Sequence, residues 1–378
     1  MKEQYYDMMA IHRKYASCAA FFITITSNPA DSDIIQNVSF DDYNLRPDIE
    51  CRAFRLKLDE IKSDIYDKGI LGIVVAHVHV IEFTSAGNPH AHMVVFTREQ
   101  DIPNTADKIN RVISAELPDS NTQPILFSLV QKFMIHGPCG QFNTKRKCMS
   151  NEKKACDCHY PKKFCEETKV KTESYSDYKR PNNKRIVYKY DMNRQVVRLD
   201  NRWVVPYNPY LLMKYQCHIN VEAVLSSLAI KYINGYMTQF DKNGIDVEIT
   251  ENEIQNYLNA RVLTPRESAW HLFKFPMQGK SHTIERMHLH LPDQETIFFD
   301  EDEDIAEKLF ENRASKLTEW FEVNNINEES RQYLYCEFGT HYRWFKRKWQ
   351  ERKVNRLIFI YFICYISEYN MYFNLDVF

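Results

Sequence analysis

Two β-rich segments joined by a short polar loop constrain the fold of this chain more than any other feature. Residues 70–83 and 90–97 are rich in Val, Ile and Phe, and Thr84-Ser-Ala-Gly-Asn-Pro89 separates them. Gly and Asn-Pro are turn signals, so we expect a hairpin whose loop is longer than two residues. Residues 19–29 alternate apolar residues with threonine and predict another half-buried strand. Apolar spacing from Phe54 to Lys68 predicts a helix.

Composition places few limits on function, although it argues against a membrane protein. The 378 residues suffice for one large or two ordinary domains. Net charge is only −2, so a nucleic-acid surface would have to be local. Ten cysteines without an N-terminal signal segment fit a reducing compartment. The one strongly apolar run, residues 357–366, is about half the length of a membrane span, so we expect a strand there and no membrane partner.

A His-x-His pair follows the hairpin loop and predicts a metal site. In a strand, residues i and i+2 point to the same face, so His90 and His92 present two imidazoles to one side. Glu82, on the preceding strand, lies across from one of them if the hairpin has the matching register. Two imidazoles and one carboxylate suit a divalent ion such as Mg²⁺ or Mn²⁺ and leave positions open for water and phosphate.

The chain contains a second pair with the same spacing, His77-Val78-His79. These two histidines share a face with Ile81 and Phe83, opposite to Glu82, and we expect them to be core or stacking residues. The spacing alone therefore leaves open whether any His-x-His pair here binds metal.

Two tyrosines are spaced to lie on one face of a helix. Residues 217–240 are predicted to be helical, with Asn220 as a plausible N-cap, and Tyr232 and Tyr236 fall within them. A tyrosine hydroxyl can attack a phosphodiester that a metal ion polarises, leaving a phosphotyrosine and a free 3′-OH. Core packing is the alternative, because the chain has 23 tyrosines.

A basic, cysteine-rich segment follows the hairpin. Residues 141–190 contain 14 Lys and Arg against 6 Asp and Glu, a balance of +8. Six residues of this segment and its start are candidate zinc ligands, from which four could form a tetrahedral site: His136, Cys139, Cys148, Cys156, Cys158 and His159. The alternative is that the cysteines are free thiols. Two basic stretches are candidate DNA contacts, the second because aromatic rings could stack on bases: Lys145, Arg146, Lys147, and then Arg343, Trp344, Lys346, Arg347 and Trp349.

Taken together, these segments resemble the helicase-like N-terminal region of Helitron transposons, which carries a rolling-circle HUH nuclease. The words that carry the resemblance are FFITITSNP, RPDIECRAFRLKLDEI, VVAHVHVIEFTSAGNPHAHMVVF, MIHGPCG, NRWVVPYNPYLLMKYQCHINVE, AIKYINGYM, LHLPDQETI and KLTEWFE. They span residues 1 to about 350. The resemblance implies an α+β, HUH-endonuclease-like fold, an antiparallel sheet flanked by helices, with a Cys-rich basic insertion and a mixed C-terminal part.

The resemblance also implies roles for particular residues. His90 and His92 would be metal ligands, Glu82 the third, and Tyr232 and Tyr236 the two nucleophiles. The family shares three of the cysteines, Cys139, Cys148 and Cys156, which favours a structural zinc. Single-stranded DNA would be the substrate, a helicase could act in trans, and nuclear residence is expected although no import signal is evident.

The chain departs from the family pattern in three places. Asn234 and Gly235 stand where the family has an aromatic residue and a lysine, although Lys231 could partly replace that cation. No G-x-x-x-x-G-K-[ST] loop is present, so the sequence predicts no ATPase or helicase activity. After about Lys353 the match fades. A non-catalytic, DNA-binding transposon remnant is therefore the alternative to an active DNA strand nickase.

We expect four regions. These are a nuclease core with the metal site (1–135), the Cys-rich segment (136–200), the tyrosine-helix part of the nuclease (201–300) and an acidic, then basic-aromatic C-terminal region (301–378).

Overall fold

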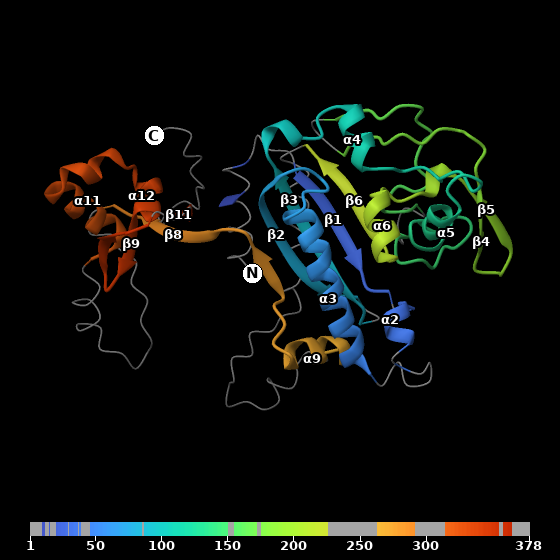
Figure 1. The fold of residues 1–378 in the computed structure, drawn as a ribbon, viewed down its shortest axis with the longest axis horizontal. Coiled ribbons are helices and arrows are strands. Elements are labelled where there is room, and N and C mark those ends of the chain that lie inside the picture. The colour runs from blue at the N-terminus through green and yellow to red at the C-terminus, as the bar shows by residue number, and fades with distance from the viewer. Residues whose placement is uncertain are drawn as a thin grey trace. The chain divides into compact units, whose positions relative to one another are not determined.

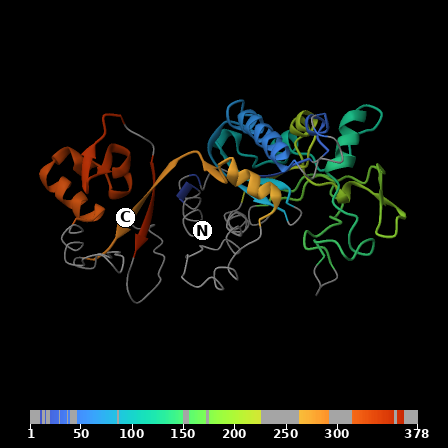
Figure 2. The same cartoon turned by 90° about the horizontal axis from the view of Figure 1, so that it is seen from below.

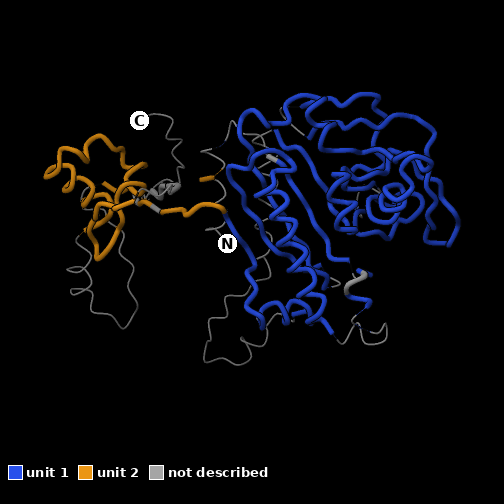
Figure 3. Tube along the Cα trace, in the orientation of Figure 1, with its two compact units in different colours: residues 1, 15–280 blue, residues 2–14, 281–378 orange. Residues whose placement is uncertain are grey.

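The computed structural model describes residues 10–11, 15, 20–28, 30–36, 38, 46–84, 87–149, 155–171, 175–225, 263–291, 314–354 and 358–364. The chain forms two compact units, one containing residues 15–280 with Met1 and the other containing residues 2–14 and 281–378 (Figure 3). Each has a hydrophobic core of its own.

A five-stranded antiparallel sheet organises the first unit. Its strands are β1 (Ala20–Thr26), β2 (Val74–Phe83), β3 (Pro89–Thr97), β6 (Ile219–Val224) and β7 (Gln278–Lys280), in the order β6-β1-β3-β2-β7 (Figure 1). Strands β2 and β3 form the expected hairpin, with Phe83 opposite Pro89. The predicted strand at residues 19–29 is confirmed as β1.

One face of the sheet is apolar and packs against helix α3 (Pro47–Tyr66), which lies along it in both views (Figures 1 and 2). Proline at the first turn starts this helix, and residues at i, i+3, i+4 and i+7 form its buried stripe. The facing strands contribute alternate residues, which are fully or almost fully buried: Phe21, Ile23, Ile25, Ala91, Met93, Val95, Val221 and Ala223. The helix predicted over Phe54–Lys68 is confirmed and begins seven residues earlier.

Strand β6 corrects the first part of the helix predicted over residues 217–240, including Asn220 as its N-cap. Ile219, Val221 and Ala223 are buried at a spacing of two, and the strand pairs along its length with β1. Its outer edge is covered, because Pro206 O accepts from Val221 N at 3.0 Å and Tyr178 Oη accepts from Ala223 N at 2.8 Å. Residues 226–262 lie outside the described part of the chain.

Much of the remainder of the first unit lies beside the β6 end of the sheet, whereas helix α9 (Pro265–Leu272) packs against α3 (Figure 1). The other elements of this remainder are α2 (Ser32–Ile35), α4 (Ala106–Val112), α5 (Pro124–Phe133), β4 (Val187–Tyr190), β5 (Val196–Leu199) and α6 (Pro209–Tyr215), with short 3₁₀ turns at Glu99–Asp101 and Asn201–Trp203. Buried Arg180 holds the loops together by donating to three backbone carbonyls, of Ala115, Asn201 and Val204.

The second unit is smaller and also mixed. It contains β8 (Thr283–Leu289), α11 (Lys316–Ile326), a 3₁₀ turn (Glu328–Gln332), α12 (Tyr335–His341), β9 (Tyr342–Phe345), β10 (Lys348–Glu351) and β11 (Ile358–Cys364). Strand β11 lies parallel to β8 and confirms the strand predicted from the apolar run. Among the described residues, none of the helices has the length and apolar character that crossing a membrane requires. The predicted α+β fold, an antiparallel sheet flanked by helices, is confirmed.

Candidate metal sites on the sheet and in the cysteine loop

The face of the sheet opposite α3 carries the predicted His-His-Glu set. Glu82 on β2 lies directly across from His90 on β3, and His92 follows on the same face. The side chain of Glu82 contacts its diagonal neighbour His92 on β3, with Glu82 Oε2 3.0 Å from His92 Nε2. The hairpin therefore has the register in which the carboxylate and both imidazoles share one face.

Two threonines on β1 contact the Nδ1 atoms of these imidazoles. Thr24 pairs with His92 and Thr26 with His90 in the register of β1 and β3. Each hydroxyl Oγ1 lies 3.1 Å from the Nδ1 of its histidine. With Nδ1 engaged in this way, Nε2 is the nitrogen that each ring offers to a metal ion.

Sequence reasoning missed these two threonines, although a signal was present. FFITITSNP places Thr24 and Thr26 at the same two-residue period as the histidines, and the register of two separate strands is needed to bring the two patterns together.

The imidazoles are parallel and partly buried. Their ring centroids lie 6.3 Å apart with planes 16° from parallel, and Phe22 stacks on His92 at 5.7 Å. Burial, with smaller contributions from His92 and His218, lowers the pKa of His90 to about 4. His90 is therefore neutral at pH 7, which is the form that ligates metal.

The polar side chains on this face of the sheet continue onto β6. Asn220 lies across from Thr24, and the backbone carbonyl of His218 accepts from Thr26 N at 2.9 Å. The His218 ring donates from Nδ1 to Phe133 O at 2.7 Å, which ties this end of the polar face to helix α5. The amide oxygen Asn220 Oδ1 is buried and has no hydrogen-bond partner among the described residues. The face opposite α3 thus offers polar groups across four strands.

The second His-x-His pair lies on the other face, as expected. His77 stacks on Tyr66 of α3 with ring centroids 3.7 Å apart. Gly279 of β7 approaches the His79 ring so closely that a Cβ there would lie 2.3 Å from a ring carbon. These contacts are those of core residues, and burial lowers the pKa of His79 to about 3.

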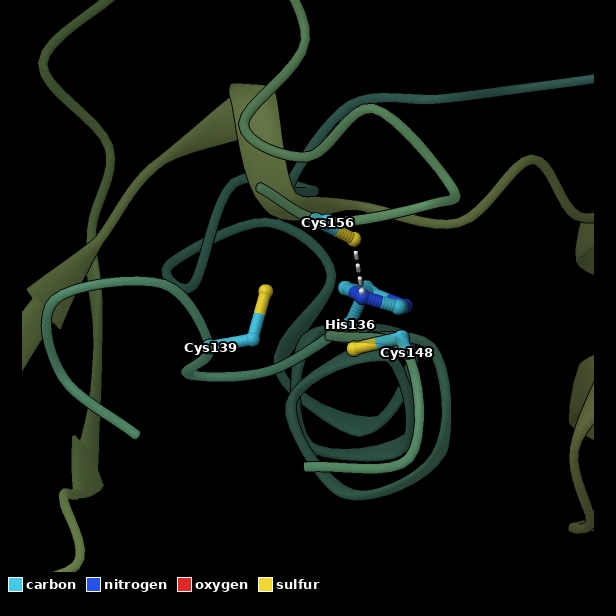
Figure 4. Close-up of side chains that lie close together, drawn as sticks. All are labelled: His136, Cys139, Cys148 and Cys156. Atoms are coloured by element: carbon cyan, nitrogen blue, oxygen red, sulfur yellow. Dashed lines mark hydrogen bonds between the residues drawn. The ribbon is translucent and has the colours of Figure 1, made fainter. Parts of the chain in front are cut away.

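Four of the six candidate zinc ligands converge in the cysteine loop (Figure 4). They are His136, Cys139, Cys148 and Cys156, whose ligand atoms all lie within 4.8 Å of one another. Among the described residues this is the one set of three or more such side chains gathered so tightly; Glu82, His90 and His92 are more widely spaced. The cysteine set, unlike the sheet set, needs little rearrangement to enclose an ion.

The chemistry of this cluster fits zinc. Three thiols and one imidazole are a common tetrahedral zinc donor set. Cys156 Sγ lies 3.3 Å from His136 Nε2, and Tyr160 stacks on the imidazole at 4.1 Å. Burial first, and then the neighbouring thiols, raise the pKa of Cys139 well above its usual range, so a bound cation is needed to make thiolates stable here.

The other two candidates lie outside the cluster. Cys158 is exposed, and His159 follows it with a backbone φ of 56°. The nearby basic residues Lys145, Arg146 and Lys147 are exposed, and Arg146 donates to Gly137 O beside the cluster at 3.3 Å.

The C-terminal aromatic and basic residues lie on the hairpin β9–β10. Trp349 is buried and donates from Nε1 to Lys316 O, and Trp344 packs against it edge-on at 5.2 Å. Arg343, Lys346 and Arg347 are exposed. Tyr232, Tyr236 and Lys231 lie outside the described residues.

Fold and site together define a mixed α+β protein whose antiparallel sheet presents a His-x-His pair beside a glutamate. Residues 1–95 match the family model of the Helitron helicase-like domain at the N-terminus. This quarter of the chain includes β1, α3, β2 and all three residues of the sheet site. The resemblance to the Helitron helicase-like N-terminal region is thus confirmed over that segment. No curated protein matches the chain.

Proposed function

We propose that this Helitron-related protein nicks and joins single-stranded DNA through phosphotyrosine intermediates, using a divalent ion held by Glu82, His90 and His92. The observation that carries the proposal is the direct contact between Glu82 and His92, buttressed from β1 by two threonine hydroxyls. The Helitron match over the same residues supports it.

Each residue has a defined part in this chemistry. A bound Mg²⁺ or Mn²⁺ would polarise the scissile phosphate. The two imidazoles and the carboxylate would bind that ion, and the threonines would orient the rings. The hydroxyl of Tyr232 or Tyr236 would lose its proton to solvent as its oxygen bonds to phosphorus, while the bond from phosphorus to the 3′ oxygen breaks and that oxygen takes up a proton from solvent, which leaves a 3′-OH. The covalent link conserves the energy for rejoining. A helicase in trans would separate the strands.

The Asn234-Gly235 spacer supports a second function, a DNA-binding protein that retains the fold without the chemistry. Gly weakens a helix by about 1 kcal/mol, and the family's lysine between the tyrosines is absent.

A covalent-adduct assay separates the two functions. Labelled single-stranded DNA is incubated with the protein and Mn²⁺, and adducts that survive denaturation are counted. We expect an adduct that is lost in His90→Ala and in the double variant Tyr232→Phe/Tyr236→Phe. His77→Phe, on the opposite face, is the matched control and should form it. An adduct that persists without both tyrosine hydroxyls, or none with the wild type, contradicts the nickase.

We also propose that His136, Cys139, Cys148 and Cys156 bind a structural zinc ion. The gathered donor atoms carry this proposal.

A further inference from the structure

The hairpin β9–β10 has two chemically different faces. Tyr342, Trp344 and Trp349 point to one side, where Tyr342 and Trp349 are buried against Phe338 of α12. Arg343 and Phe345 point to the other side, and both are exposed. Because side chains alternate along a strand, the tryptophans belong to the core and Phe345 is the ring that the hairpin presents to solvent.

Cations surround this exposed ring. The guanidinium of Arg343 lies 5.3 Å from the Phe345 ring centroid and the ammonium of Lys346 lies 5.7 Å from it. Arg343 also donates to Gln350 Oε1 on the partner strand at 3.0 Å, which holds it across the hairpin. Lys348 pairs directly with Phe345 and is exposed as well. Residues 341–353 contain six Lys or Arg and one Glu.

The two-residue turn between β9 and β10 has a backbone conformation that its own residues disfavour. Lys346 and Arg347 connect the strands, and both have positive φ, 47° and 57°. Two-residue hairpin turns with positive φ strongly prefer Asn-Gly, because a Cβ is disfavoured in that conformation. Two cations thus occupy a position where Asn-Gly would be more stable. Residues kept at a cost to stability are concentrated at functional sites.

We propose that this tip, Arg343, Phe345, Lys346, Arg347 and Lys348, is a binding surface for single-stranded DNA. Phe345 stacks on an unpaired base while the cations contact the phosphates on either side. Duplex DNA keeps its bases stacked on one another and cannot offer a base to the ring. The choice of single-stranded DNA as the ligand rests on the proposed function. The arrangement of the exposed ring and its cations is observed independently of that function.

Fluorescence anisotropy with a labelled oligo-dT and the full chain, without added Mg²⁺ or Mn²⁺, tests the stacking. Loss of one aromatic–base stack weakens binding by about 5- to 150-fold, so we expect that loss in Phe345→Ala and recovery in Phe345→Trp. Phe321→Ala removes a phenylalanine from helix α11 that is 58% exposed, compared with 46% for Phe345, and is the control that should leave the affinity unchanged. Equal affinities for Phe345→Ala and the wild type contradict the proposal.

The turn gives a second, independent arm. Replacing Lys346-Arg347 by Asn-Gly should raise the urea midpoint of unfolding, because the strain is relieved. It should also weaken binding and flatten the dependence of log K on log salt by about 1.4, about 0.7 for each lost phosphate contact. A turn variant that is more stable and binds as tightly as the wild type overturns the proposal.

Competition identifies the partner. Unlabelled duplex DNA and phosphatidylserine vesicles should compete poorly, and equal competition by either would show a general anion patch and overturn the proposal. If the adduct assay fails while Phe345→Ala still weakens binding, the nickase is wrong and this surface stands.

Discussion

The hydroxyls of Thr24 and Thr26 engage the Nδ1 atoms of His92 and His90, which leaves Nε2 of each ring as the nitrogen for the proposed metal ion. Both lie 3.1 Å from an Nδ1 atom, on the strand next to the histidines. Groups that orient a metal-ligating histidine typically change metal affinity 10- to 100-fold when they are removed.

We therefore expect Thr24→Val or Thr26→Val to weaken Mn²⁺ binding by about 10- to 100-fold, measured by calorimetric titration, and serine at either position to restore it. Thr97→Val is the control. Thr97 is fully buried on β3, and its hydroxyl has no hydrogen-bond partner in the described part of the chain. Removing that hydroxyl should therefore change neither the Mn²⁺ affinity nor the stability of the protein. Equal effects of all three valine variants would mean that the threonines act only through packing.

At the scale of elements, the cysteine loop lies between α5 and β4 and packs into the second core of the first unit. Cys139 and Cys156 are buried in that core, whereas Cys158 is exposed. A zinc ion here would fix a loop that has little regular secondary structure of its own.

We expect one zinc ion per chain by elemental analysis, lost in Cys139→Ser and retained in Cys158→Ser. Without the ion the first unit should lose at least about 2 kcal/mol of stability, which for a unit of this size lowers Tm by about 4–8 °C. Zinc retained in Cys139→Ser, or lost in Cys158→Ser, would place the ligands elsewhere.

The sequence predicted an element correctly where its local hydrophobic pattern indicates the same structure as its pairing with distant strands. The strands β1, β2, β3 and β11 and the helix α3 have strong periodicity and were predicted. Strand β6 was mistaken for the start of a helix, because the hydrogen bonds that make it a strand come from β1, some 200 residues earlier. The zinc candidates were narrowed from six to four only by folding, since spacing could not show that Cys158 points to solvent.

At the scale of the whole molecule, two compact units that share no hydrophobic core predict two unfolding transitions. Phe338 is completely buried in the core of the second unit, and phenylalanine-to-alanine changes at such positions cost about 3–5 kcal/mol. By differential scanning calorimetry, Phe338→Ala should lower one transition and Cys139→Ser the other. A single transition that both variants shift together would contradict independent units.

We propose that Glu82, His90 and His92 form a divalent-metal site on the sheet, separate from the cysteine cluster. Calorimetric titration of zinc-loaded protein with Mn²⁺ tests it most directly. We expect one Mn²⁺ per chain in the wild type, lost in Glu82→Gln and in His90→Ala and retained in Cys139→Ser. Mn²⁺ binding that survives both sheet variants, or that is lost only in Cys139→Ser, would contradict it.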